Sequence, residues 1–192
     1  MLRSLVGSEM CIRDSAITGA YTGLGLALYE NLSLKYPCYR TQARLESMSQ
    51  LIDEIQPCNI LINNANIYGN HHQLEVLDRV YRLWQQRDNL IINIGSRAAV
   101  PNISQNHLHS TYKAAVNHYS TNVTYGDRDK QCRITTVNPG LMDRGLDWSL
   151  DYSEVVTVVE WLLTLPRDIE INRIDLQRNI PYPEVEDRKR AV

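Results

Sequence analysis

Thr18-Gly19-Ala20-Tyr21-Thr22-Gly23-Leu24-Gly25 is the stretch that decides the fold of this 192-residue chain. It follows a short strand-like run at 16–19 and leads into an apolar helical pattern at 23–34. Glycines at these spacings allow a tight turn, a close approach of the backbone to a ligand, and helix N–H groups that point at a pyrophosphate. The stretch predicts a dinucleotide site, although an ordinary strand–helix turn can carry the same glycines.

Strand-like and helix-like segments alternate along the rest of the chain. The expected strands are 38–44, 59–63, 90–95, 133–137 and 171–176, and the expected helices are 47–55, 74–86, 109–123 and 153–163. Runs such as Ile60-Leu61-Ile62 are apolar without alternation, which is typical of parallel strands covered by helices on both faces. We predict a single-domain α/β fold with a doubly wound, Rossmann-like parallel sheet.

The composition argues against several classes of partner. The formal net charge is −2 and the basic residues are scattered, so the sequence predicts no nucleic-acid binding. No apolar run approaches the roughly 18 residues that cross a bilayer, so we expect no membrane segment. The cysteines form no CxxC pair, and His107 and His118 lack an acidic or thiol partner at ligand spacing. We therefore expect no metal and a reducing, cytoplasmic location.

The N-terminal segment stands apart from this pattern. Residues 5–15 resemble the translation of a sequencing-library adapter, and the charged pair Arg13 and Asp14 would interrupt a buried strand. We expect 1–15 to be a non-native extension, 16–178 to be the folded domain and 179–192 to be a polar tail. The alternative is that the segment contributes a native first strand.

Four further segments occur in the order of one known enzyme family. They are Asn63-Asn64-Ala65-Asn66, the strand-like Leu90-Ile91-Ile92-Asn93-Ile94-Gly95-Ser96, His109-Ser110-Thr111-Tyr112-Lys113, and Pro139-Gly140. With the glycine stretch, they resemble the short-chain dehydrogenase/reductase family over nearly all of residues 16–178. The resemblance implies NAD(P)-dependent hydride transfer between a nicotinamide cofactor and a carbonyl or alcohol substrate.

The resemblance also implies roles for single residues. Ser96 would hydrogen-bond the reacting carbonyl or hydroxyl, and Lys113 would hold the nicotinamide ribose. Asn66 stands where the family has glycine, and asparagine tolerates the left-handed backbone such a turn requires. The implied cofactor-binding residues are Thr18, Gly19, Tyr21, Thr22, Gly23, Leu24, Gly25, Arg40, Asn64, Ala65, Asn66, Lys113, Pro139 and Gly140.

The catalytic segment departs from the family pattern. Family members carry Tyr-x-x-x-Lys on one helix face, and here His109 stands four residues before Lys113. Tyr112 points about 100° away around a helix and cannot substitute. An ammonium group beside His109 disfavours the imidazolium form, which is the form able to donate a proton. Two interpretations stay open: His109 is the acid, or it is a polar residue in a degraded site. The family's catalytic asparagine also has no counterpart in 74–86.

The adenosine end of the expected site is altered as well. Only about 40 residues separate Gly23 from Asn64, so one strand and its helix are expected to be shortened or lost from the first half of the sheet. Between residues 37 and 44 no acidic side chain is present to bind a ribose 2′-hydroxyl, whereas Arg40 and Arg44 could meet a 2′-phosphate. This slightly favours NADP(H) over NAD(H), unless both arginines are simply solvated.

The sequence thus predicts an oxidoreductase acting on a small-molecule carbonyl or alcohol. The alternative function is a noncatalytic NAD(P)-binding sensor that kept the glycines and Lys113 but lost the proton donor. A purely structural domain would leave the glycine stretch unexplained. The segments 74–86 and 109–123 resemble the family's dimerising helices, so a homodimer is also expected.

Overall fold

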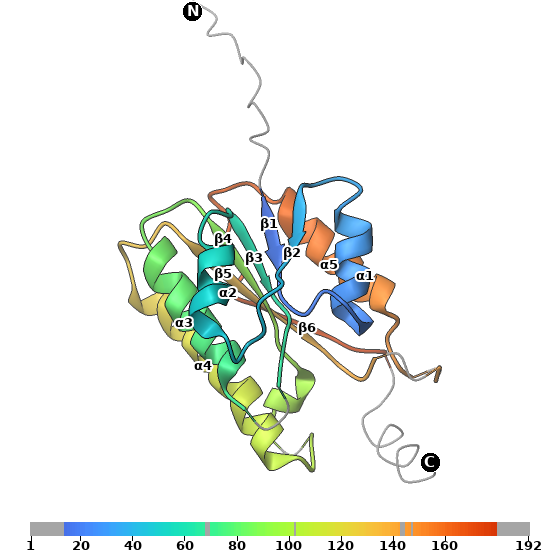
Figure 1. Cartoon of the computed structure of the whole chain (residues 1–192). Coiled ribbons are helices and arrows are strands. Elements are labelled where there is room, and N and C mark those ends of the chain that lie inside the picture. Colours follow the sequence, from blue (N-terminus) through green and yellow to red (C-terminus); the bar gives the residue numbers. More distant parts are fainter. Residues whose placement is uncertain (1–13, 68–69, 102, 143–144, 147, 180–192) are drawn as a thin grey trace, which may run out of the picture.

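Six parallel strands form one sheet in the order β2-β1-β3-β4-β5-β6 (Figure 1). The strands are β1 Ser15–Ile17, β2 Cys38–Arg40, β3 Ile60–Asn63, β4 Leu90–Ile94, β5 Arg133–Pro139 and β6 Arg173–Leu176. The structure is a computed structural model and describes residues 14–67, 70–101, 103–142, 145–146 and 148–179. The predicted doubly wound parallel sheet is confirmed.

The strand order reverses between β1 and β3, which lie side by side. From β1 the chain steps outward to β2, and it then returns to β3 and proceeds in the other direction to β6. Ligands of open α/β sheets bind at such a reversal, beyond the carboxyl ends of the strands. Among the described residues only β2 lies beyond β1, so the first half of the sheet is short, as predicted.

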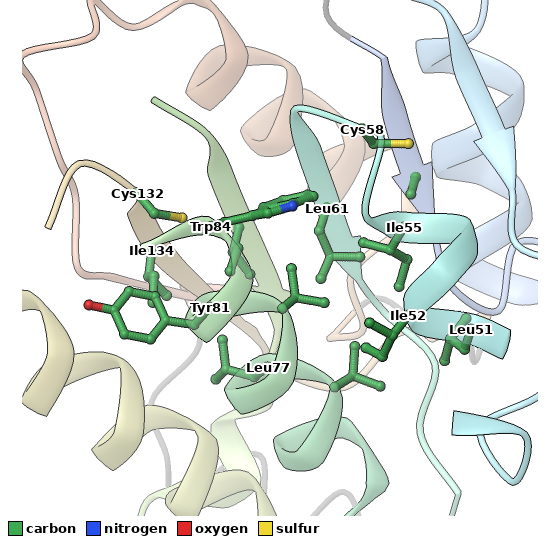
Figure 2. Close-up of a cluster of buried hydrophobic side chains, with 14 of the residues drawn as sticks. Leu51, Ile52, Ile55, Cys58, Leu61, Leu77, Tyr81, Trp84, Cys132 and Ile134 are labelled. Carbon is green, nitrogen blue, oxygen red and sulfur yellow. The ribbon is translucent and has the colours of Figure 1, made fainter. Parts of the chain in front are cut away.

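Helices cover both faces of the sheet (Figure 1). They are α1 Gly23–Leu32, α2 Met48–Ile55, α3 His72–Trp84, α4 His107–Gly126 and α5 Tyr152–Thr164. One core cluster joins α2 and α3 to Leu61, Ile91 and Ile134 of the sheet, and Figure 2 shows Trp84 of α3 packed near Leu61. The second cluster joins α1 and α5 to the alternate strand residues, among them Ile62 and Ile92. Both strand faces are buried, which explains the apolar runs.

Several element ends differ by a few residues from the sequence expectation, and at two of them a side chain bonds to the backbone. Strand β2 ends at Arg40 rather than at 44, because the next free amides, those of Gln42 and Ala43, donate to the Glu54 carboxylate. Helix α4 begins at His107 rather than at 109, because the Asn106 side chain caps it.

Asp14 and Ser15, the last two residues of the expected N-terminal extension, bond to the sheet. The Asp14 carbonyl accepts hydrogen bonds from the backbone N–H groups of Asn59 and Ile60 at 3.0 and 3.1 Å. Ser15 is fully buried and opens β1. Ser15 is thus part of the sheet, and Asp14 is hydrogen-bonded to it. Residues 1–13 of the expected extension and 180–192 of the expected tail lie outside the described residues.

Within the described ranges, no helix combines the length and the apolar character needed to span a membrane. The same residues contain no cluster of three or more His, Cys, Asp or Glu side chains arranged for a metal ion.

Candidate active site

The glycine stretch forms the turn between β1 and α1. Gly19 and Gly23 have φ angles of +65° and +54°, a left-handed conformation that side chains other than glycine rarely adopt. A Cβ atom on Gly25 would lie 2.1 Å from the Gly19 carbonyl oxygen and 2.6 Å from Asn64 Nδ2. The turn is therefore too tightly packed at Gly25 for any larger residue.

Thr18 and Asn64 tie this turn to the end of β3. The Thr18 hydroxyl oxygen accepts hydrogen bonds from the backbone N–H groups of Asn64 and Ala65, at 3.0 and 2.9 Å. The Asn64 side-chain amide donates to the Thr18 carbonyl at 3.1 Å. These bonds fix the carboxyl ends of the two strands that flank the reversal of strand order.

A cavity of about 730 Å³ opens beside the glycine turn. Ligand pockets usually measure about 300–1,000 Å³, so this volume suits a nucleotide. Its walls come from the glycine turn, the loop after β2, Leu51 of α2 and the residues after β3. The lining residues are Thr18, Gly19, Tyr21, Thr22, Leu24, Gly25, Thr41, Gln42, Ala43, Arg44, Leu45, Glu46, Leu51, Asn64, Ala65, Asn66 and Ile67.

The N-terminus of α1 faces this site with its first-turn N–H groups unused by a cap. Thr22 is the N-cap residue, and its side chain makes no capping hydrogen bond. The first N–H groups of a helix have no partner within the helix, and they favour an anion such as a pyrophosphate. The glycine turn and this helix end therefore fit the phosphates of a dinucleotide.

Arg40 and Arg44 lie in different surroundings. The Arg40 guanidinium stacks on the Tyr29 ring, 3.9 Å from its centroid, and lies 5.6 Å from that of Tyr21. Arg40 does not line the cavity, whereas Arg44 does, and Arg44 is exposed. Stacking orients the Arg40 charge. Of the two, only Arg44 directly contacts the space where a ligand would lie.

Ser96 directly follows β4 and is held at two points. Its backbone N–H donates to Asn138 Oδ1 at 3.0 Å, and its hydroxyl oxygen accepts from the Ala98 N–H at 3.1 Å. Accepting that bond leaves the hydroxyl proton itself for another acceptor. Ser96 is thus oriented at the carboxyl edge of the sheet as a hydrogen-bond donor.

Lys113 is deeply buried on α4, with only 5% of its surface exposed. Its ammonium nitrogen donates to Gln73 Oε1 at 2.7 Å and to the Ile94 carbonyl at 2.9 Å. Burial disfavours the charged form and lowers the pKa of Lys113 to about 8. The lysine is close to its titration point at physiological pH, and neutral acceptors, not a carboxylate, stabilise its charge.

Gln73 is a site residue that the sequence analysis missed. Its side-chain nitrogen donates to the Asn63 carbonyl at 2.7 Å and to the Ile94 carbonyl at 2.9 Å. The amide therefore connects α3 with the ends of β3 and β4, and it also accepts from Lys113. One signal was present in the sequence: Gln73 is a polar residue on the buried face that continues with Val76 and Leu77.

His109 lies on α4 one turn before Lys113 and is half-buried. Burial and, secondarily, the charge of Lys113 lower the pKa of His109 below its ordinary value. The imidazole is therefore mostly neutral at neutral pH. Tyr112 points toward another part of the molecule, where its ring lies 6.3 Å from that of His71.

The other expected residues divide between the cavity and its surroundings. Ala65 and Asn66 line the cavity beside Asn64, whereas Ser96, His109 and Lys113 do not. Helix α4 packs against Arg97–Ala99, the short 3₁₀ helix that follows Ser96, so these three residues belong to neighbouring elements. Pro139 ends β5, and the Gly140 N–H donates to the Leu176 carbonyl of β6 at 2.7 Å.

Known structures share this architecture at low sequence identity. Serine dehydrogenase from Escherichia coli is 21% identical and superimposes with a TM-score of 0.73, covering 88% of this chain and 100% of that one. A 3-ketoacyl-(acyl-carrier-protein) reductase from Brucella melitensis, complexed with NADH, is 12% identical with a TM-score of 0.71 and coverages of 92% and 99%. A short-chain dehydrogenase from Leptospira borgpetersenii with bound NAD⁺ is 17% identical with a TM-score of 0.69 and coverages of 85% and 90%.

No protein-family model matches the sequence, and no curated protein matches it. At these identities the likeness to solved structures concerns the fold. The strand order, the helices on both faces and the glycine turn at the reversal give this chain the fold of the short-chain dehydrogenases and reductases.

Proposed function

We propose that this chain is a divergent member of the short-chain dehydrogenase/reductase family and an NAD(P)-dependent oxidoreductase for a small carbonyl or alcohol. The observation that carries the proposal is the glycine turn, packed against Asn64 and open to the cavity at the N-terminus of α1. The same turn leaves the first N–H groups of α1 without a side-chain cap, so they are available to an anion such as a pyrophosphate.

A bound nicotinamide cofactor would supply or accept the hydride. In the proposed arrangement Ser96 donates a hydrogen bond to the substrate oxygen. The bond from the Ala98 N–H uses the Ser96 hydroxyl oxygen as acceptor, so the hydroxyl proton is available to be donated. Lys113 supplies positive charge next to the ribose, and Gln73 holds its ammonium group in place. His109 stands where a proton donor is needed, but its lowered pKa leaves little of the protonated imidazolium to donate at neutral pH.

The proposal includes a slight preference for NADP(H). Arg44 lines the cavity, and the Arg40 guanidinium is stacked nearby on Tyr29. Both charges suit a 2′-phosphate. A cytoplasmic location and a homodimer through α3 and α4 complete the proposal.

One observation favours a second candidate function, a noncatalytic NAD(P)-binding protein. The Lys113 ammonium already donates to Gln73 and Ile94, and the neighbouring residue 109 is a largely neutral imidazole. Such a site can bind a dinucleotide while lacking an efficient proton donor.

The two candidates differ in turnover. The test is an NADPH-oxidation assay over a panel of aldehydes and ketones at several pH values, with the wild type and Ser96→Ala. The enzyme function predicts turnover that falls at least tenfold in Ser96→Ala. Equal rates in both proteins, combined with NADPH binding, would favour the noncatalytic function.

A further inference from the structure

The loop between β2 and α2 forms one wall of the cavity. All residues from 41 to 46 line it, as does Leu51 of α2. Leu45 is 6% exposed and anchors the loop in the core beside Leu51.

Glu54 of α2 holds this loop in position. Its carboxylate accepts the backbone N–H of Gln42 at 2.7 Å and that of Ala43 at 3.1 Å. Thr41, just before them, still donates its N–H to the Ile17 carbonyl of β1 at 3.2 Å. The last backbone N–H group that bonds to β1 is therefore that of Thr41, and the next two bond to the Glu54 carboxylate instead of the sheet. Hydrogen bonds to an ionised carboxylate are stronger than those between neutral groups.

The position of the cavity identifies the part of a dinucleotide that would meet the loop. The cavity extends from the glycine turn to the loop, and its lining does not include Ser96 or Lys113. If the pyrophosphate lies on the turn and the nicotinamide lies toward Ser96, the adenosine lies toward the loop. Ala43, which is only partly buried and lines the cavity, then offers apolar surface to the flat adenine ring.

We propose that Glu54 is a positioning residue for the adenosine end of the cofactor: its carboxylate fixes the loop at 41–46 as the wall against which the adenosine packs. This inference rests on the proposed function and deepens it. Glu54 acts through the backbone of Gln42 and Ala43 and has no direct contact with the ligand. Removing the Glu54 carboxylate weakens the binding of ligands that carry adenosine and leaves the binding of a ligand that carries only the phosphates unchanged.

The experiment compares Glu54→Ala and Glu54→Gln with the wild type and with Asp53→Ala. Asp53 is the matched control, because it is an exposed carboxylate adjacent to Glu54 on the same helix. Calorimetric titrations use ADP-ribose as the adenosine ligand and inorganic pyrophosphate as the ligand without adenosine. We expect ADP-ribose to bind at least tenfold more weakly to Glu54→Ala and Asp53→Ala to stay within twofold of the wild type. Glu54→Gln keeps one oxygen acceptor and should restore part of the loss, whereas pyrophosphate affinity should not change.

The outcomes separate the two proposals. A wild type that binds neither ADP-ribose nor NADPH contradicts the proposed function itself. If the wild type binds ADP-ribose and a folded Glu54→Ala binds it with an affinity within twofold of the wild type, the role of Glu54 is overturned. The role is also overturned if Glu54→Ala loses pyrophosphate affinity by the same factor as ADP-ribose affinity. If Glu54→Ala does not fold, the ADP-ribose affinity of Glu54→Gln and the hydrogen exchange of the wild-type backbone amides take its place as tests. Backbone amides of Gln42 and Ala43 that are not protected from exchange in the wild type would overturn the inference.

Discussion

At the scale of single residues, the proposed function predicts that His109 limits proton transfer to the substrate. Its pKa is lowered by burial and by Lys113, so the fraction of imidazolium increases only as the pH falls below the ordinary histidine value of about 6.5. A phenol keeps its proton up to a pH of about 10. A tyrosine in the same place would therefore remain an acid across the neutral range.

We accordingly expect His109→Tyr to raise carbonyl-reductase activity at pH 7–8 by at least about tenfold, or about 1.4 kcal/mol of barrier. A positioned general acid typically contributes about 10²–10⁴-fold, so partial recovery is measurable. NADPH oxidation by the wild type, His109→Tyr and His109→Ala checks the effect. A wild type faster than both variants would show that imidazole is the working acid and would refute the prediction.

Lys113 makes stability depend on pH. Its pKa is about 8 in the folded state and about 10.4 when unfolded, so between these values the unfolded chain binds more protons. The free energy of unfolding must then rise with pH in this window, and the penalty for burying the charge is fully present below pH 8.

From pH 7.5 to 9.5 we expect Lys113 to add about 2 kcal/mol to the free energy of unfolding. Denaturant titrations of the wild type and Lys113→Met at both pH values measure this contribution. Parallel pH dependence of the two proteins would contradict it, because other titrating groups contribute equally to both.

At the scale of elements, the turn between β1 and α1 tolerates no added atom at Gly25. We expect Gly25→Ala to lower the free energy of unfolding by about 1–3 kcal/mol, because the Cβ would meet the Gly19 carbonyl at 2.1 Å. Gly126→Ala at the end of α4 is the control, because a Cβ there would meet nothing within 4 Å, and its expected change is within about 0.5 kcal/mol. Equal unfolding midpoints for Gly25→Ala and the wild type would show that the turn is not packed as described.

The sequence predicted those elements whose signals are local. The apolar runs of β3 and β4 and the glycine turn follow from burial and backbone geometry within a few residues. The end of β2 and the role of Gln73 could not be predicted in this way. Glu54 is 12 residues from Gln42, and Lys113 is 40 residues from Gln73, so those contacts exist only once the elements pack together.

At the scale of the whole molecule, the start of the domain can be located by truncation. We expect removal of 1–13 to change the free energy of unfolding by no more than about 0.5 kcal/mol. Removal of Asp14 and Ser15 as well should cost about 1–3 kcal/mol, because the N–H groups of Asn59 and Ile60 lose their acceptor. Denaturant unfolding of the two shortened chains tests this, and a large loss from the first truncation alone would contradict it.

The proposed function requires a dinucleotide site at the reversal of strand order, and calorimetric titration of the wild type and Gly23→Val with NADPH and NADH tests this site most directly. We predict binding of at least one cofactor to the wild type with a Kd near micromolar, or about −8 kcal/mol. Gly23→Val should abolish this binding, because Gly23 has a φ of +54° and a β-branched side chain there strains the turn on which the phosphates would lie. Absence of binding to the wild type, or unchanged titrations with a folded Gly23→Val, would contradict the account.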